Sequence, residues 1–262
     1  MLTRSFLAAV FIISMTGTCF AAHPLITDDT GTQGKGKFQV ELNGKFAFDR
    51  ERVEGVKVRE RAGEILTIVS AGVIDRVDIV LALPYQWLNV KEDGETTSDV
   101  NGLSDGSLEV KWRFYEKDGL SFALKPGIAF PTGNEKKGLG TGKLSFALTS
   151  ITTFERDSWA IHLNLGYGRN EYRLREDINA NRKDIWRVTL AGEIEVIKDL
   201  KAVANIGAER NSDKESTRHP AFILGGLIYS VSENFDVDFG IMRGINKPET
   251  DFAILAGIAL RF

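Results

Sequence analysis

The stretch FQVELNGKFAF, residues 38–48, decides the fold because its apolar side chains recur at every second position. Strict alternation of apolar and polar residues predicts a β-strand with one apolar face and one polar face. The apolar set is Phe38, Val40, Leu42, Phe46 and Phe48, and the polar set is Gln39, Glu41, Asn43 and Lys45.

The same alternation returns along the whole chain in segments of about ten residues. It is clear in VDIVLALPYQW (77–87), SLEVKWRFY (107–115), WAIHLNLGYGRN (159–170), IWRVTLAGEIEV (185–196) and FDVDFGIM (235–242). Segments 65–73 and 221–231 are apolar on both faces, and LKAVANIGAER (200–210) is rich in small residues. We count about twelve predicted strands, an even number as in bacterial outer-membrane barrels.

The predicted connections alternate strictly between long and short, which places both termini on the short-turn side. The long ones lie near 50–60, 89–106, 133–143, 170–183, 210–219 and 243–250, and the short ones at 74–76, 116–119, 155–158, 197–199 and 231–234. Short periplasmic turns and longer outside loops characterise bacterial outer-membrane barrels. Residues 37–262 are therefore predicted to form an all-β, transmembrane, antiparallel up-and-down β-barrel, with lipid against the apolar face.

A soluble β-sandwich is the alternative for alternating strands, with its apolar face turned inward. Every predicted hairpin joins immediate neighbours, so no long crossover is available for a Greek key. Aromatic residues also gather at strand ends, where rings suit the two water–lipid interfaces. These residues are Tyr85, Trp87, Trp112, Phe114, Trp159 and Trp186.

Residues 1–22 have the features of a secretory signal peptide: a positive start at Arg4, an apolar run, and small residues at Ala21 and Ala22. Cleavage there removes Cys19, the only cysteine, so disulfides cannot stabilise the mature chain. The mature chain keeps 32 Lys and Arg against 36 Asp and Glu. This balance gives no basic excess for nucleic acid. After residue 22 no apolar run is long enough for a helical membrane span.

The C-terminus ends in Phe262, preceded at two-residue steps by Leu260, Ile258 and Ala256. This ending resembles the signal recognised by the barrel-assembly machinery. Pro84 and Pro126 fall inside predicted strands, where each removes a ladder donor, and a bulge or bend is expected at both.

Three further segments carry a family resemblance: HPLITDDTGTQGKGKFQVELN (23–43), GVIDRVDIVLALPY (72–85) and GLSDGSLEVKWRFY (102–115). Together they resemble the outer-membrane transporter family named for the MetA (meta-cleavage) pathway of phenol degradation. The resemblance covers most of the mature chain and is densest in its first half. It implies an outer-membrane location in a Gram-negative bacterium and passage of hydrophobic or aromatic compounds. It supplies no catalytic residues.

Residues 23–36 precede the first strand and contain the polar run Thr27, Asp28 and Asp29. One hypothesis is a short periplasmic plug that enters the barrel mouth, with its carboxylates paired to lumen cations. The other is a structural turn whose side chains cap local backbone. The segment lacks the ligand spacing of a calcium loop.

The polar faces of the strands predict a lumen of mixed charge, which either sets the selectivity of a water-filled path or fills the interior with ion pairs. The residues concerned are Glu41, Lys45, Asp78, Glu109, Lys111, Arg113, Lys125, Arg187, Glu193, Glu195, Asp236, Asp238 and Arg261.

Catalytic chemistry finds little support in the sequence. The mature chain has only His23, His162 and His219, and no Cys/His cluster suggests zinc, so neither metal nor cofactor is expected. GLGTGK (138–143) fails the phosphate-loop pattern, because Leu144 stands where Ser or Thr is needed.

The leading interpretation is a passive outer-membrane channel for small, hydrophobic or aromatic solutes, with diffusion through the lumen or lateral escape at the proline-bearing strands 77–90 and 120–131. Its expected partners are outer-membrane lipid, the barrel-assembly machinery and a small solute. Two alternatives stay open: a structural barrel with a filled lumen and interactive loops, and a barrel hydrolase that uses His162.

Overall fold

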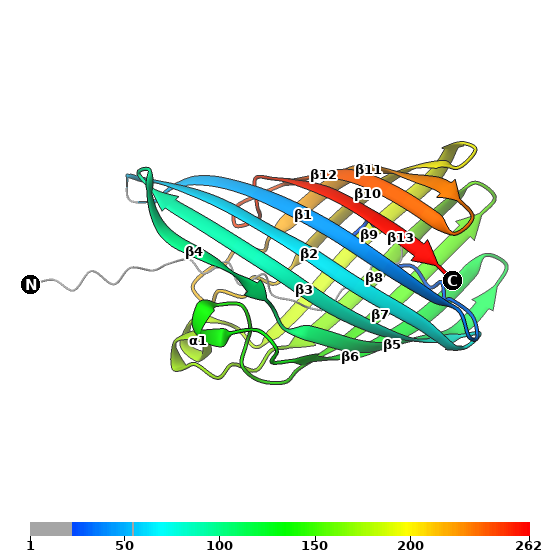
Figure 1. The fold of residues 1–262 in the computed structure, drawn as a ribbon, viewed down its shortest axis with the longest axis horizontal. Helices are drawn as coiled ribbons and strands as arrows, with labels where there is room; N and C mark the ends of the chain where they lie inside the picture. Colours follow the sequence, from blue (N-terminus) through cyan, green and yellow to red (C-terminus); the bar gives the residue numbers. More distant parts are fainter. Residues whose placement is uncertain (1–22, 54) are drawn as a thin grey trace, which may run out of the picture.

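The computed structural model describes residues 23–53 and 55–262. The prediction of a signal peptide at 1–22 therefore lies outside the described residues. Figure 1 shows an elongated barrel, with the C-terminus at one end and α1 at the other. No helix in the described ranges is long and apolar enough to cross a bilayer.

Thirteen strand segments make one antiparallel sheet that closes on itself. They are β1 (Phe38–Val53), β2 (Val56–Ile74), β3 (Val77–Glu92), β4 (Glu95–Leu103), β5 (Gly106–Lys117), β6 (Leu120–Phe130), β7 (Ser145–Arg156), β8 (Trp159–Arg169), β9 (Asp184–Ile197), β10 (Leu200–Glu209), β11 (Ala221–Ser232), β12 (Phe235–Gly244) and β13 (Phe252–Arg261). Two short helices, η1 (Glu135–Lys137) and α1 (Arg175–Ala180), lie in connections. Because β4 and β5 both pair with β3, one after the other, the ring has the 12 strands that the sequence predicts.

The ring closes where the first and last strands meet. β1 pairs with β13 from Gln39–Arg261 to Phe48–Phe252. Elsewhere around the barrel, neighbouring strands follow each other in the sequence, except that β5 also pairs with β3. Phe262 completes the seam, since its backbone N–H donates to the Phe38 carbonyl at 2.9 Å and its ring stacks on the Phe38 ring. Closure leaves no sheet edge within the ring, as hydrocarbon requires.

The apolar stripe of each strand faces outward, as predicted. In β1 the exposed positions are Phe38, Leu42, Phe46 and Phe48, while Gln39, Glu41 and Asn43 are buried on the inner side. A soluble sandwich would bury these rings, so the burial pattern excludes it. The apolar outer stripe of β1 is 11 residues long, which matches the roughly 9–11 residues of a tilted membrane strand.

Two of the six predicted long loops are wrong. The stretches 50–60 and 89–106 are mostly strand: β1 extends to Val53 and β2 begins at Val56, and β3 and β4 form a hairpin with a tight turn at 93–94. Their polar composition suggested loops, but polar side chains also suit a sheet extension, here of β1, β2, β3 and β4, that is in contact with water. The other four long loops occur at 131–144, 170–183, 210–220 and 245–251, and the five short turns are present as predicted.

Both strand prolines coincide with interrupted pairing. β3 pairs with β5 as far as Ala82 and with β4 from Tyr85 onward, so Pro84 sits where the partner changes. Between β5 and β6 the pairing skips from Glu109–Gly127 to Trp112–Leu124, and Pro126 lies in the gap. A proline cannot donate to the ladder, which explains both breaks.

Candidate functional site

The N-terminal segment, residues 23–36, runs across the barrel interior near the short-turn end. It contacts strands on opposite sides of the ring before it enters β1. Its partners, in order along the segment, are Asp238 on β12, Asn205 on β10, Lys111 and Lys125 on β5 and β6, Ser121 and Thr153 on β6 and β7, and Asp78 on β3.

Asp28 is the ionic centre of the segment. One carboxylate oxygen accepts from the Lys111 ammonium at 2.8 Å, and the other accepts from the Lys125 ammonium at 2.7 Å. The side chains of all three residues are at most 3 % exposed. Lys125 also lies 3.5 Å from the Glu109 carboxylate, which gives the cluster two cations and two acids.

The electrostatics of the cluster keep Asp28 ionised. Burial alone would raise the pKa of Asp28, but the charges of Lys111 and Lys125 and their hydrogen bonds outweigh it. The pKa therefore lies below the ordinary value of 3.8. Lys111 and Lys125 themselves lie in the interrupted stretch of the β5–β6 pairing, and Lys125 directly precedes Pro126.

Side chains of the barrel wall also form hydrogen bonds with the backbone of the segment. With its amide oriented to satisfy both groups, Asn164 donates to the Asp28 carbonyl at 2.9 Å and accepts from the Asp28 N–H at 2.7 Å. Asn205 accepts from the N–H groups of Ile26 and Thr27 and donates to the Thr27 hydroxyl at 2.8 Å. These bonds pair buried backbone groups that otherwise would cost free energy.

Asp29 behaves differently from its neighbour. Its carboxylate accepts from the Gly31 N–H two residues on and lies at 3.8 Å from the Lys111 ammonium, a longer contact than that of Asp28, and its side chain is 25 % exposed. Both hypotheses for the run 27–29 therefore describe part of it: Asp28 pairs with lumen cations, and Asp29 caps local backbone.

Two wall glycines make room for the segment. A Cβ on Gly226 of β11 would lie 2.6 Å from Pro24, and one on Gly240 of β12 would lie 2.7 Å from it. Atoms do not approach so closely, so any side chain at these positions must displace the segment. The outward-facing Gly225 beside them has nothing within 4 Å.

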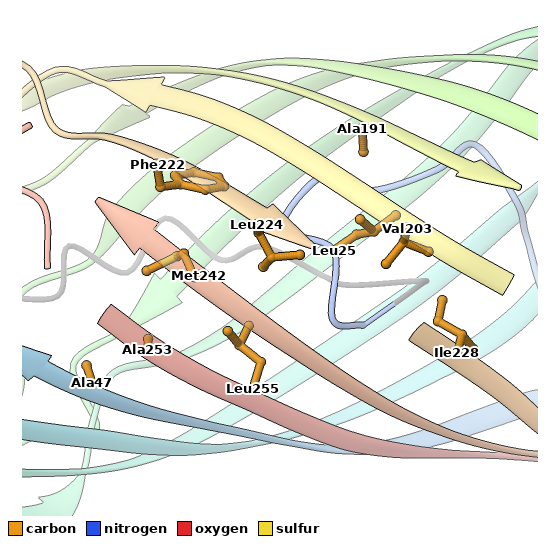
Figure 2. Close-up of a cluster of buried hydrophobic side chains, with 10 residues drawn as sticks. All are labelled: Leu25, Ala47, Ala191, Val203, Phe222, Leu224, Ile228, Met242, Ala253 and Leu255. Atoms are coloured by element: carbon orange, nitrogen blue, oxygen red, sulfur yellow. The ribbon is translucent and has the colours of Figure 1, made fainter. Parts of the chain in front are cut away.

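One side of the lumen is apolar, which the sequence analysis missed. Inward side chains of β9–β13 and β1 form a buried cluster that Leu25 of the N-terminal segment joins (Figure 2). The cluster comprises Leu25, Ala47, Ala191, Val203, Phe222, Leu224, Ile228, Met242, Ala253 and Leu255. The sequence did contain one indication of it: residues 221–231 are apolar at both odd and even positions, so the inner face of this strand is apolar as well as its lipid face.

All thirteen charged residues predicted for the lumen lie on the inner face of their strands, at different depths. Glu41, Asp78, Glu109, Lys111 and Lys125 are buried around the N-terminal segment. Lys45, Arg113, Arg187, Glu193, Asp236, Asp238 and Arg261 are half-buried, and Glu195 is exposed at the short-turn rim. Several pair with each other or with a neighbour: Arg187 with Glu209, Glu193 with Lys201, Asp238 with His23, and Arg261 with Asp236.

Hydrogen bonds also hold the barrel wall at the connection between β4 and β5. The buried Asp105 accepts from the N–H groups of Gly133 and Thr141, at 2.9 and 2.7 Å. Loop 131–144 is thereby held against the point where β3 changes partner. The free edge of β4 lies just beyond this contact, since β4 pairs only with β3.

His162 offers no catalytic arrangement. Its Nδ1 contacts the Thr153 hydroxyl at 2.9 Å, and its buried Nε2 has no hydrogen-bond partner within the described ranges. The buried carboxylates Asp28 and Glu109 lie against Lys125. Among residues 23–53 and 55–262 there is no group of three His, Cys, Asp or Glu side chains placed to hold a metal ion.

Comparison with known proteins agrees with this architecture. The family described as "Putative MetA-pathway of phenol degradation" matches residues 24–262, and a search of curated proteins found no match. An outer membrane channel from Pseudomonas putida F1 shares the fold with a TM-score of 0.70 and 14% identity, over 89% of this chain and 98% of that one.

Other solved barrels are similar at lower scores. The KdgM porin superposes with a TM-score of 0.55 at 8% identity, over 86% of this chain and 99% of that one. The toluene transporter TbuX from Ralstonia pickettii gives 0.52 at 9% identity, over 87% and 89%. At these identities the likeness concerns the fold, which is that of outer-membrane channels and porins.

Proposed function

Because the chain belongs to the family named for the MetA pathway of phenol degradation, we propose that it is an outer-membrane channel for passive entry of small hydrophobic or aromatic solutes. The protein is a bacterial outer-membrane barrel, and its fold relatives are channels rather than enzymes. The proposal that the solutes are hydrophobic or aromatic rests on one observation, the apolar inner wall of β9–β13.

This wall supports weak binding of an aromatic ring once the N-terminal segment shifts, because its side chains pack with Leu25 and with each other and are at most 8 % exposed. Phe222 and Met242 lie near the outer ends of β11 and β12, and Leu224 lies one inward step deeper. Burial of apolar surface contributes roughly 25 cal/mol of favourable free energy for each Å² removed from water. A small aromatic ring has little surface to bury, so its binding to the wall is weak. A fully charged lumen would instead favour ions and sugars.

The N-terminal segment is part of the proposal as a plug. Asp28 holds it across the short-turn half of the lumen, so solute passage requires it to shift or leave a narrow path beside it. The charged residues of the polar wall then set which solutes pass the plug. Lateral escape toward lipid at the interrupted β3–β5 and β5–β6 pairings is the second exit.

The test is uptake by porin-depleted cells that express the protein. Phenol and arabinose are offered separately, and their entry rates are compared for wild type, Leu224→Gln/Met242→Gln and Leu224→Met. We expect the double variant to lose phenol uptake severalfold and keep arabinose uptake, because only the apolar wall has changed. The volume-conserving Leu224→Met should match wild type. Equal phenol uptake in all three would refute the role of the wall.

A closed structural barrel is the second candidate, and the buried ionic cluster around Asp28 favours it. Single-channel recording separates the two. A wild-type protein that gives no conductance and no solute-dependent swelling of liposomes is a structural barrel, and the channel proposal then fails.

A further inference from the structure

The outer surface of the β1–β2–β3 extension carries a cluster of cations, here called the outer basic patch. Its members are Arg50, Arg52, Lys57, Arg59, Arg61 and Lys91, and all six are exposed. In antiparallel strands directly opposed residues share a face, so the register decides where each side chain points. The register places all six on the face that carries the lipid-facing aromatics of the same strands.

The patch begins where the apolar stripe ends. Arg61 is paired with Phe48, the last apolar residue of the outer stripe of β1. One step further out Arg50 pairs with Arg59, and Arg59 with Lys91; beyond them Arg52 pairs with Lys57. Below the patch the lipid-facing Phe46 and Trp87 rings pack together, with centroids 5.5 Å apart. The cations therefore lie at the level of lipid headgroups on the long-loop side of the membrane.

The inner face of the same hairpin has the opposite charge. Asp49 opposes Glu60 there, and Lys247 pairs with Asp49. The outer cations have no comparable partner: in the described part of the chain, none of the six makes an ion pair with a carboxylate. Acidic groups at the margin are Asp99, opposite Asn89, and two residues that accept from backbone of the patch: Asp93 from the Lys57 N–H at 3.0 Å, and Asp251, which also pairs with Lys247, from the Arg50 N–H at 3.1 Å.

Like charges directly opposite each other destabilise a sheet. Among the described residues, no side-chain ion pair offsets this cost in the three cation pairs of the patch, so an external anion at this level stabilises the hairpin. Arginine forks match phosphate oxygens in pairs, which makes phosphate the fitting anion. Clusters of four to eight cations beside a membrane span typically bind anionic lipid headgroups.

We propose that the outer basic patch binds the phosphorylated glycolipid of the outer leaflet through its phosphates. Its acyl chains would then lie along the apolar stripe below, beside Phe46 and Trp87. The inference rests on the outer-membrane location and not on what passes through the lumen. It fails or holds independently of solute transport.

The test is a titration of purified detergent-solubilised protein with bisphosphorylated lipid A, followed by native mass spectrometry. We compare wild type with Arg59→Gln/Lys91→Gln. The matched control is Lys136→Gln/Lys137→Gln, which removes the same charge from two exposed lysines of η1 at the same end of the barrel. Folding is checked in each by the heat-modifiable migration of an intact barrel.

We expect the patch variant to bind lipid A at least about tenfold more weakly, and the control to bind as wild type. Dephosphorylated lipid A should bind wild type as weakly as the patch variant binds lipid A. Equal binding by patch variant and control overturns the proposal. Displacement of lipid A by millimolar inorganic phosphate also overturns it, because the site would then be a general anion site. If the patch variant does not fold, the affinity of the wild-type protein for lipid A is measured at increasing NaCl concentration. An affinity that does not change with added NaCl refutes a charge-based site.

Discussion

Asp28→Asn is the substitution that tests most directly how the N-terminal segment is held. It removes the charge that two buried ammonium groups share at 2.7 and 2.8 Å, and changes almost nothing in size. Removing one partner of a buried ion pair costs roughly 3–5 kcal/mol, because the other charge stays buried and uncompensated. Glu109 lies 3.5 Å from Lys125 and offsets part of this, so we take the lower end of the range.

A loss of about 3 kcal/mol shifts the docking equilibrium of the segment by roughly a hundredfold toward the undocked state. The barrel itself should survive, because its ladders do not involve Asp28. The expected result is a larger or more frequently open conductance in planar bilayers. A reporter cysteine at Leu25, which is fully buried, should become accessible to a thiol reagent in the Asp28→Asn background only.

The control is Asp29→Asn, which removes the same charge one residue away, from a side chain that is 25 % exposed, accepts from the Gly31 N–H and lies 3.8 Å from the Lys111 ammonium, against 2.8 Å for Asp28. It should leave conductance and labelling near the wild-type values, since solvent screens exposed charges. If Asp28→Asn and Asp29→Asn behave alike, or if Leu25→Cys stays protected in both, the ionic anchor is not what holds the segment.

The remaining predictions concern pH, a wall glycine and the C-terminus. Because the pKa of Asp28 is lowered, its stabilising contribution is present above the ordinary value of 3.8 and is lost only as pH falls through the still lower folded value. The difference in Leu25→Cys labelling between wild type and Asp28→Asn should therefore stay constant from neutral pH to about pH 5, and a difference that shrinks within that window would contradict the assignment. Gly240→Ala should push Pro24 aside and raise conductance, because within 3 Å its Cβ would meet only Pro24, whereas Gly225→Ala, with open space around it, should not. Deleting Phe262 removes two backbone bonds and a ring stack at the seam, about 2–3 kcal/mol, and should lower the yield of heat-modifiable barrel; an unchanged yield would argue against its role in closure.

The membrane-facing surface could be predicted from local pattern. The alternation in residues 38–48 assigns each β1 side chain to one face, and the structure places Phe46 and Phe48 outside and Glu41 inside, as predicted. The prolines at 84 and 126 also marked the interrupted ladders correctly. Each of these depends only on a residue and its near neighbours.

Other features escaped local reasoning. The charged extension of β1 and β2 resembles a loop in composition, because a sheet extension in contact with water needs no apolar alternation. The apolar inner wall was hidden in residues 221–231, where both parities are apolar and the inner stripe cannot be separated from the lipid stripe.

The sequence by itself determined that this chain spans a membrane as a closed ring, because period-two patterning and polar turns report which medium touches each face of a strand. Only the tertiary structure decided what occupies the ring. Asp28 meets Lys111 and Lys125 across 83 and 97 residues of chain, and Leu25 meets a wall built from strands near the other terminus. Such contacts arise when closure brings distant strands around one axis, and no local pattern encodes which inward side chains then face each other.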